Sequence, residues 1–310
     1  MAEYITIDSG TTNTRISLMS EGKQIRTLTF PVGATKDIED KTLLAKTLKQ
    51  GIADLLKETR RTEKDIRCIL ACGMITSEFG LVELPHIQIP AGMRELSEAA
   101  EERRIEEITS IPFVFFRGVK TPCSDIANAD MMRGEECELM GIFQGEGTYV
   151  LSGSHTKIVR MDNLGRIVDF RTMLTGEMIS AIANNTILKD SVELREISPN
   201  REWLNEGFGY AAAHGINEAL FKVRVLKNLF KKSPEEVYNF YLGVLLSEEI
   251  SCILSRKPDR IVLGGAKALK QALAVLLSER DESNVTVLTD EQVKQSLSIG
   301  MIKLYEMKKN

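Results

Sequence analysis

The first thirty residues alternate short apolar runs with polar turns, which is the pattern of strands joined in a meander. Strands are predicted at residues 4–7, 16–18 and 25–29, where apolar and β-branched side chains gather. A polar loop at residues 8–13 separates the first two strands, and residues 21–22 make the next turn. The chain is therefore expected to open with a three-stranded meander.

The same order of elements restarts in the second half of the chain. Strands are predicted at residues 148–151, 156–161 and 166–170, and a small polar turn at residues 152–155 follows the first of them. A meander whose first turn contains glycine and hydroxyl residues thus occurs twice, about 145 residues apart. This repetition predicts a duplicated α/β architecture.

Apolar spacing and capping residues predict the remaining elements. Helices are expected at residues 40–57, 94–104, 234–254 and 268–277, and from residue 290 onward. Buried strands are expected at residues 66–71, 112–116 and 260–263. The clearest helix start has Ser233 as N-cap, Pro234 at the first helical position and Glu236 three residues after the cap. Asp40 and Asp290 are the expected caps of the first and last helices.

The chain length and one glycine-containing joint predict two domains. The chain has 310 residues, and a domain typically takes about 150. Gly145-Glu146-Gly147 offers a flexible connection. Domains are therefore predicted at residues 1–144 and 145–310, each carrying one copy of the repeated meander.

Composition narrows the class of protein. With 43% hydrophobic and 27% charged residues, the chain is typical of a soluble globular protein. A net charge of −4 gives no broad attraction for nucleic acid. No signal peptide is expected, because the first residues lack a basic region followed by a long apolar stretch. No membrane span is expected either, because no run reaches the roughly 20 apolar residues that a span requires. Five scattered cysteines favour a reducing cytoplasmic location over a disulfide framework.

The loop after the first strand has the chemistry of a phosphate-binding turn. Gly10 leaves the backbone accessible, and the hydroxyls of Thr11 and Thr12, together with free amides, can donate to phosphate oxygens. Asp8, at the end of the strand, could hold Mg²⁺ directly or through water. Taken alone, the loop fits a simple hairpin turn equally well.

A matching turn in the second half strengthens the phosphate-binding interpretation. Its candidate residues are Ser152, Gly153, Ser154 and His155. A third glycine-containing element, Gly264-Gly265, follows a buried strand and opens a helix, so a flat ring could lie against its backbone. A hairpin turn and a helix cap remain the structural alternatives for these two segments.

Acidic residues are dense between residues 125 and 141, and Asp130 is the candidate of interest. Asp130 is predicted at a helix start after the strand at 112–116. A carboxylate in that place is either an N-cap or a general base at the mouth of a cleft. Asp125 is a nearby competitor.

Taken together, these residues resemble the 2-dehydro-3-deoxygalactonokinase family, in the superfamily of sugar kinases, heat-shock chaperones and actin. The resemblance covers nearly the whole chain and rests on five blocks: DSGTTNTR at 8–15, GMITS at 73–77, MRGEE at 132–136, GSHTK at 153–157 and DFRTMLTGE at 169–177. The chain departs from the family at two positions: it has Ser9 where the family often has Trp, and Ser152 where the family often has Pro.

The resemblance implies an α/β fold of two ribonuclease-H-like (actin-like ATPase) domains with a nucleotide cleft between them. It implies phosphorylation of the 6-hydroxyl of 2-dehydro-3-deoxy-D-galactonate by ATP with Mg²⁺. The first phosphate loop and the acceptor site would belong to residues 1–144, and the second loop and the adenosine motif to residues 145–310. The rival readings are a kinase for another sugar acid and an ATPase switch of the same superfamily.

The resemblance also assigns roles to single residues. It implies ATP and metal contacts in the first phosphate loop (Asp8, Gly10, Thr11, Thr12), the second loop (Ser152, Gly153, Ser154, His155) and the adenosine motif (Gly264, Gly265). Asp130 matches the catalytic aspartate of related sugar kinases. The substrate is an anion, so one of Arg15, Arg133 and Arg171 is expected to bind its carboxylate. The expected partner is this small molecule, with a homodimer left open.

Overall fold

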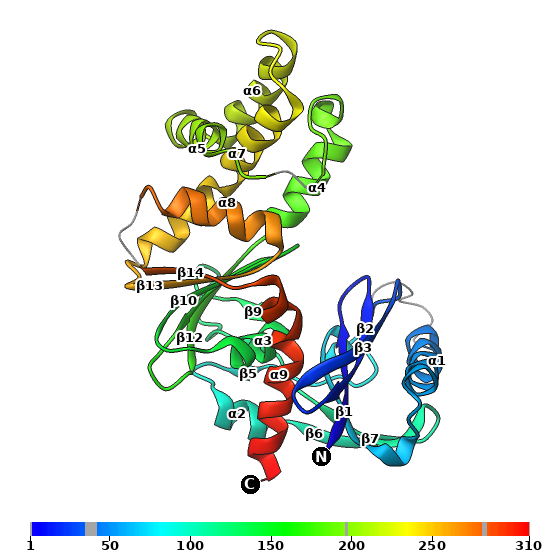
Figure 1. The fold of residues 1–310 in the computed structure, drawn as a ribbon. Coiled ribbons are helices and arrows are strands. Elements are labelled where there is room, and N and C mark those ends of the chain that lie inside the picture. The colour runs from blue at the N-terminus through cyan, green and yellow to red at the C-terminus, as the bar shows by residue number, and fades with distance from the viewer. Residues whose placement is uncertain (1, 35–41, 196–197, 281–283, 310) are drawn as a thin grey trace. The chain divides into compact units, whose positions relative to one another are not determined.

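A computed structural model describes residues 2–34, 42–195, 198–280 and 284–309 (Figure 1). The chain forms two compact units. Unit 1 comprises Met1–Gly145, Met161–Asp169 and Glu291–Asn310, and unit 2 comprises Glu146–Arg160 and Phe170–Asp290. Unit 1 thus also takes in residues 161–169 and the last helix, which follow the joint at residues 145–147 in the sequence.

Unit 1 is built on a six-stranded sheet in the order β3-β2-β1-β4-β7-β6. Its strands are β1 (Glu3–Ser9), β2 (Thr14–Ser20), β3 (Lys23–Phe30), β4 (Ile66–Gly73), β6 (Glu101–Ile105) and β7 (Thr109–Phe115). β1 is antiparallel to β2 and parallel to β4, and β4 is parallel to β7. The predicted meander is confirmed, and the carboxyl ends of β1, β4 and β7 meet at one edge of the sheet.

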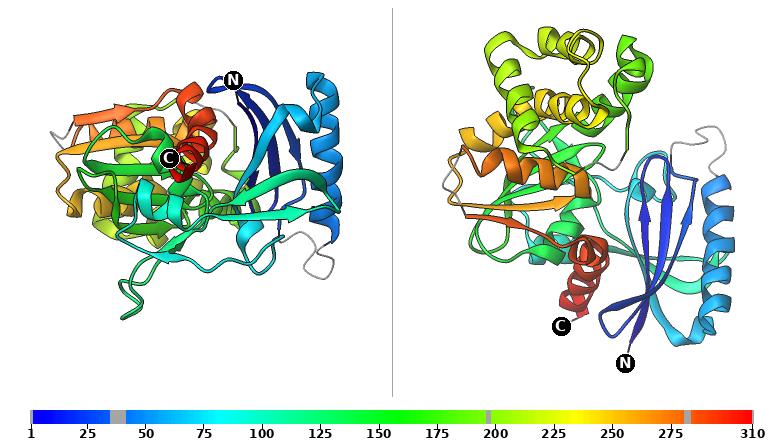
Figure 2. Two further views of the ribbon diagram at one scale, coloured as in Figure 1. Left: turned by 90° about the horizontal axis from the view of Figure 1, so that it is seen from below. Right: turned by 45° about the horizontal axis from the view of Figure 1, so that its top comes forward.

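Helix α1 (Thr42–Thr59) runs along the meander of unit 1, as the views of Figures 1 and 2 agree. Its apolar stripe includes Leu48, Ile52 and Leu55, all buried in one core with the sheet residues Ile7 and Ile16. Full burial of such a side chain contributes about 1.5–3 kcal/mol. The start expected at Asp40 lies outside the described residues.

The helix predicted at residues 94–104 is wrong in its second half. Helix α2 (Met93–Glu98) begins where the Glu95 carboxylate accepts a hydrogen bond from the Gly92 amide at 2.8 Å, and it ends at Ala99. The charged run that follows forms β6, an edge strand that pairs antiparallel with β7. Charged side chains suit an exposed sheet edge, and pairing with β7 overrides the local preference for helix.

The second large sheet repeats the topology of the first. Its order is β12-β11-β10-β13-β14. The strands are β10 (Gly147–Ser152), β11 (Thr156–Met161), β12 (Ile167–Met173), β13 (Arg260–Gly265) and β14 (Asn284–Val287). Position by position, this order matches β3-β2-β1-β4-β7, with a meander followed by two parallel strands. The repetition confirms the predicted duplicated, ribonuclease-H-like α/β fold.

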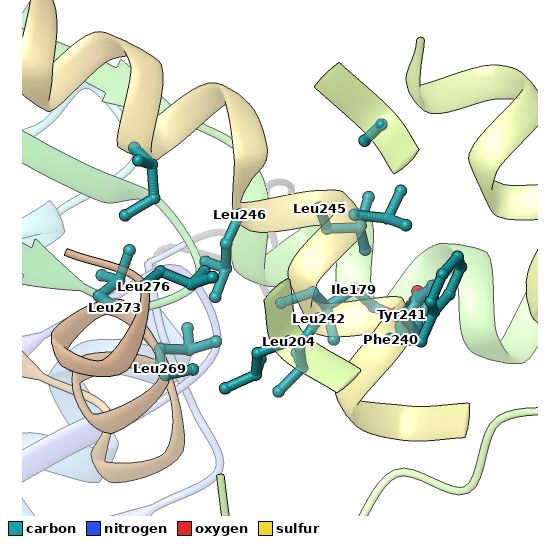
Figure 3. Close-up of a cluster of buried hydrophobic side chains, with 14 of the residues drawn as sticks. Ile179, Leu204, Phe240, Tyr241, Leu242, Leu245, Leu246, Leu269, Leu273 and Leu276 are labelled. Carbon is teal, nitrogen blue, oxygen red and sulfur yellow. Dashed lines mark hydrogen bonds between the residues drawn. The ribbon is translucent and has the colours of Figure 1, made fainter. Parts of the chain in front are cut away.

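Five α-helices of unit 2 pack around an apolar core: α4 (Thr175–Asn185), α5 (Arg201–His214), α6 (Ile216–Asn228), α7 (Pro234–Ser255) and α8 (Lys267–Leu277). Figure 3 shows Leu269, Leu273 and Leu276 of α8 near Leu246 of α7. By length and composition α7 could cross a membrane, but 78% of its apolar window is buried inside the protein, as in a core helix.

The predicted start of α7 is confirmed in detail. The Ser233 hydroxyl accepts a hydrogen bond from the Glu236 amide at 3.3 Å, and the Glu236 carboxylate accepts one from the Ser233 amide at 2.8 Å. Two helix-end amides are thereby satisfied by two side chains. A purely local signal therefore set this boundary.

The remaining elements complete unit 1 and the connections. They are β5 (Ile87–Gln88), β8 (Val119–Lys120), β9 (Met131–Met132), α3 (Glu135–Ile142) and α9 (Asp290–Lys309), with short 3₁₀ turns η1 (Glu63–Asp65), η2 (Met74–Thr76) and η3 (Ile187–Asp190). Helices α3 and α9 cross with their backbones in contact. A Cβ on Gly141 would lie 1.9 Å from the Ser296 carbonyl oxygen, and one on Gly300 would lie 1.8 Å from that of Cys137.

Candidate functional site

The first candidate phosphate loop connects β1 to β2 in unit 1. Its turn is closed by the Gly10 amide, which donates to the Asn13 carbonyl at 2.8 Å. Thr11 and Thr12 are exposed. A Cβ on Gly10 would meet only the Asn13 carbonyl oxygen, at 3.5 Å, which is ordinary contact. The fold therefore does not require glycine at this position.

The second candidate loop connects β10 to β11 at the corresponding place in unit 2. Ser154 is exposed. In the described part of the chain, no heavy atom lies within 4 Å of the place that a Cβ on Gly153 would occupy. Gly10 and Gly153 thus stand at matching positions of the repeat, and neither is demanded by packing. Backbone without side chains is what an approaching phosphate requires.

The second loop is joined to the glycine pair that ends β13. Ser152 lies opposite Gly265 in the parallel pairing of β10 with β13. The buried Ser152 hydroxyl donates to the Gly264 carbonyl at 2.8 Å, and the Ala266 amide donates to the Ser152 carbonyl at 2.7 Å. The Ser152 side chain therefore holds the two segments together and is turned away from solvent.

The backbone conformation at position 265 explains why this residue is glycine. Its φ is +85°, and an added Cβ would lie 2.0 Å from the Ser152 carbonyl oxygen. Only glycine combines this backbone conformation with so close an approach. Strand packing thus accounts for Gly265, and its contact with adenosine stays a prediction.

The N-terminus of α4 supports the second loop from one side. The Glu177 amide donates to the Ser154 carbonyl at 3.1 Å, and the Glu177 carboxylate lies 2.9 Å from His155 Nε2. A Cβ on Gly176 would lie 2.1 Å from the Gly153 carbonyl oxygen, so the loop rests directly on the helix start. In this structure His155 is engaged with Glu177.

Asp8 is the candidate metal ligand of the first loop. Burial raises the pKa of its carboxyl, and Glu135 adds to this effect, while Arg15 opposes it with an ion pair of 2.9 Å to Oδ2. The described part of the chain contains no group of three or more His, Cys, Asp or Glu residues arranged for a metal. A single carboxylate nevertheless fits Mg²⁺, which commonly keeps its waters and takes its other ligands from substrate phosphates.

Asp130 does not lie at a helix start, so that part of its prediction is wrong. It precedes β9 at the base of the hairpin formed with β8, and its amide donates to the Thr121 hydroxyl at 2.7 Å. Asp125 lies in the exposed tip of this hairpin, where its carboxylate accepts from the Asn128 amide at 3.0 Å. Because β8 and β9 pair as a hairpin, the next helix begins only at Glu135. The sequence did not reveal this pairing.

Glu135 is the acidic residue that sequence reasoning passed over. It is the first residue of α3, directly after Gly134, whose φ of +111° turns the chain into the helix. Its negative charge raises the pKa values of Asp8, Glu136 and Glu138. The preceding Gly134 lies against Gly73, since a Cβ on Gly134 would be 3.5 Å from the Gly73 Cα, and Gly73 pairs with Ser9 at the end of β1. In the sequence, its position directly after Gly134 in the MRGEE block was the signal that could have identified it as a candidate.

The three candidate arginines occupy different environments. The four terminal N–H groups of Arg133 face the Thr76 carbonyl and hydroxyl (2.8 and 2.7 Å), the Leu84 carbonyl (3.1 Å) and His86 Nδ1 (3.3 Å). The Arg133 side chain therefore stabilises the segment that follows β4, from Thr76 to His86. The side chain of Arg15 is 59% exposed beside Asp8, and Arg171 donates to the Phe170 carbonyl at 2.8 Å.

These two units, each with an open glycine turn after its first strand, define a nucleotide-binding fold of the actin-like ATPase type. The activator of 2-hydroxyisocaproyl-CoA dehydratase from Clostridium difficile, solved with ADPNP bound, has this fold, with a TM-score of 0.53 and 13% identity over 99% of this chain and 96% of that one.

Within this class the chain belongs to the 2-keto-3-deoxy-galactonokinase family, whose sequence profile matches residues 8–299. It is similar to the 2-dehydro-3-deoxygalactonokinase of Escherichia coli K12, with 26% identity over 81% of this chain and 80% of the relative. A crystal structure of a candidate 2-dehydro-3-deoxygalactonokinase from Sinorhizobium meliloti matches with a TM-score of 0.77 and 23% identity over 97% and 98% of the two chains. The predicted family is confirmed, and with it the class of carbohydrate kinase.

Proposed function

We propose that this protein transfers the γ-phosphoryl group of ATP to the 6-hydroxyl of 2-dehydro-3-deoxy-D-galactonate, a step in galactonate breakdown. The observation that carries the proposal is the pair of open turns at Gly10 and Gly153. They occupy equivalent places in a duplicated fold and have no packing reason to be glycine. The family match supports the choice of a sugar acid as acceptor.

In this proposal the two turns bind the phosphates through backbone amides and through the exposed hydroxyls of Thr11, Thr12 and Ser154. Asp8 is the residue that would hold Mg²⁺, whose charge offsets that of the phosphate oxygens during transfer. The strand ends that carry Gly264 and Gly265 would lie against adenosine. All three segments are held by hydrogen bonds within their own unit, so they are preorganised.

The acceptor hydroxyl needs a carboxylate that orients it and accepts its proton late in the transfer. Two residues of unit 1 compete for this role. The proximity of Glu135 to Asp8 supports Glu135, because the attacking hydroxyl must lie near the metal-bound phosphate. Asp130 is the choice that the family resemblance favours, and its Oδ1 accepts from the Met131 amide at 2.7 Å.

The carboxylate of the substrate needs a cation, and Arg15 is the best supported of the three arginines. Its guanidinium is largely exposed and lies at the edge of the sheet where β1 ends. Arg133 is committed to carbonyls of its own unit, and Arg171 is the remaining alternative. A cytoplasmic location and a homodimer stay predictions.

The test is an assay of ADP release by the full chain across a panel of 2-keto-3-deoxy sugar acids. Turnover should be highest with 2-dehydro-3-deoxy-D-galactonate. Preference for another acid would change the substrate assignment, and equal ADP release without acceptor would favour an ATPase switch. Glu135→Gln and Asp130→Asn are matched variants, and the true base should lose about 10²- to 10⁴-fold in kcat.

A further inference from the structure

Glu136 is a buried acid that the proposed reaction does not use. It is the second residue of α3, and its side chain is shielded from solvent. The Gly134 amide donates to its carboxyl group, with Oε2 at 2.8 Å and Oε1 at 3.0 Å. The Cys137 thiol donates to Oε1 at 3.5 Å. The carboxyl group of Glu136 is therefore turned back toward the start of its own helix.

The hydrogen bond from Gly134 closes a turn with an unusual backbone conformation. Gly134 has a φ of +111°, a value that residues with a side chain rarely adopt. It is buried and is the N-cap residue of α3, and the first amides of an α-helix have no partner within the helix. A buried amide without any partner costs about as much free energy as a lost hydrogen bond. Glu136 supplies the partner that this amide requires.

The turn lies where two strands of unit 1 end. A Cβ on Gly134 would be 3.5 Å from the Gly73 Cα, so the two backbones are in contact. Gly73 pairs with Ser9 at the end of β1. A Cβ on Gly73 would lie 2.6 Å from the Ser9 carbonyl oxygen and 3.6 Å from Asp8 Oδ1. The start of α3 therefore rests on the strand ends that carry the candidate metal ligand.

The same turn fixes the direction of the Glu135 side chain. Glu135 follows Gly134 directly, and its carboxylate accepts a hydrogen bond from the Arg133 amide at 3.1 Å. The amides of residues 133 and 134 are thus each held by the carboxyl group two positions further along the chain. Because Arg133 and Glu135 lie on opposite sides of Gly134, a change in the backbone angles of Gly134 would move one relative to the other.

We propose that Glu136 is a positioning residue that holds the turn at Gly134 and thereby directs the Glu135 carboxylate to the reacting hydroxyl. The inference rests on the proposed function and on Glu135 as the base. In this proposal Glu136 touches neither substrate, so its loss should lower kcat and leave ATP affinity unchanged. Its loss should have no effect on kcat once Glu135 has lost its basic group.

Two variants of the full chain test this role. Glu136→Met has a similar volume but cannot accept the hydrogen bond from Gly134, and its kcat should fall about 10- to 100-fold, as for a reacting group misplaced by about 1 Å. The Kd for ATP, measured by calorimetry, should stay within about threefold of the wild type, because α3 carries neither phosphate loop. Glu136→Gln keeps an acceptor oxygen, and its kcat should stay within about twofold.

Urea unfolding checks that Glu136→Met is folded, because this variant leaves the buried Gly134 amide without an acceptor. If it does not fold, Glu136→Asp takes its place. Its side chain is one methylene shorter, so the hydrogen bond to the Gly134 amide should lengthen and kcat should fall at least about fivefold.

Two further measurements distinguish positioning from a merely structural role. In a double variant with Glu135→Gln, the Glu136→Met substitution should cause no further fall in kcat, because it acts only through Glu135. Hydrogen exchange of the Gly134 amide, followed by NMR in the protein without ligand, should be at least about tenfold faster in Glu136→Met than in the wild type or in Glu136→Gln.

Four results would overturn the inference. They are an unchanged kcat in folded Glu136→Met, an equal fall in Glu136→Met and Glu136→Gln, a further fall of about tenfold or more in the double variant, and an unchanged kcat in Glu135→Gln. If the wild type phosphorylates no sugar acid, the proposed function fails, while exchange of the Gly134 amide still decides whether Glu136 holds the turn.

Discussion

Gly10→Val tests whether a phosphate approaches the first loop. A Cβ at this position would lie 3.5 Å from the Asn13 carbonyl oxygen and close to nothing else. The loop residues Thr11 and Thr12 are exposed, so the valine methyl groups have solvent to occupy. The free energy of unfolding should therefore change by less than about 1 kcal/mol, as for surface substitutions that create no strain.

The effect on nucleotide should be far larger than the effect on stability. Valine would cover the backbone amides that a phosphate must reach, and a hydrogen bond to a charged group contributes about 1.5–3 kcal/mol. The loss of one such bond corresponds to roughly 10- to 150-fold in dissociation constant. Calorimetric titration with Mg·ATP measures this, and urea unfolding of the same preparation verifies the fold.

Gly209→Val is the matched control. Gly209 is an exposed glycine in α5, and a Cβ there also has open space. This variant should bind ATP as the wild type does. An unchanged ATP affinity in folded Gly10→Val would refute the assignment of the loop, and an equal loss in Gly209→Val would show that the effect is not local.

Three further outcomes follow from the structure. Gly265→Ala should lower the free energy of unfolding in urea by more than about 2 kcal/mol, because it combines a positive φ with a clash against the Ser152 backbone. Gly264→Ala is the control and should lower it by less, because the nearest contact of its Cβ is a leucine methyl group at 3.0 Å. Arg133→Lys should lower the melting temperature measured by calorimetry, since lysine cannot reproduce the fork that holds the segment after β4. Burial raises the pKa of Glu136 to about 8. The stability linked to its proton is therefore present below about pH 4.5 and is lost as pH rises through 8, by at most about 1.4 kcal/mol per pH unit. In urea unfolding across this range, the free energy of unfolding of Glu136→Gln should depend less on pH than that of the wild type.

Local signals in the sequence were sufficient for most elements. The meander strands, the capped start of α7 and the strand–glycine–helix order at Gly264-Gly265 depend on side-chain alternation, a capping box and conformational freedom, all of which act within a few residues. The repeat of the meander was visible because both copies bury the same kind of strand. The duplicated fold and the family could therefore be predicted from the sequence.

The errors arose where distant segments decide the conformation. The run from Glu101 to Arg104 has helix-forming residues but becomes an edge strand because β7 offers it hydrogen bonds. The sequence pattern predicts Asp130 at a helix start, whereas β8 pairs with β9 and α3 begins only at Glu135. No pattern of neighbouring residues contains this information.

The sequence by itself determined the repeated fold and predicted the candidate site residues, namely the glycines and hydroxyls of two equivalent turns and an acidic segment between them in the chain. Only the tertiary structure decided which partners the side chains of these and neighbouring residues meet. It turned the Ser152 hydroxyl inward to Gly264, and it engaged the Arg133 guanidinium with the carbonyls of Thr76 and Leu84. The physical reason is that residue type limits what a group can bind, whereas burial and long-range hydrogen bonds determine which of its partners it meets.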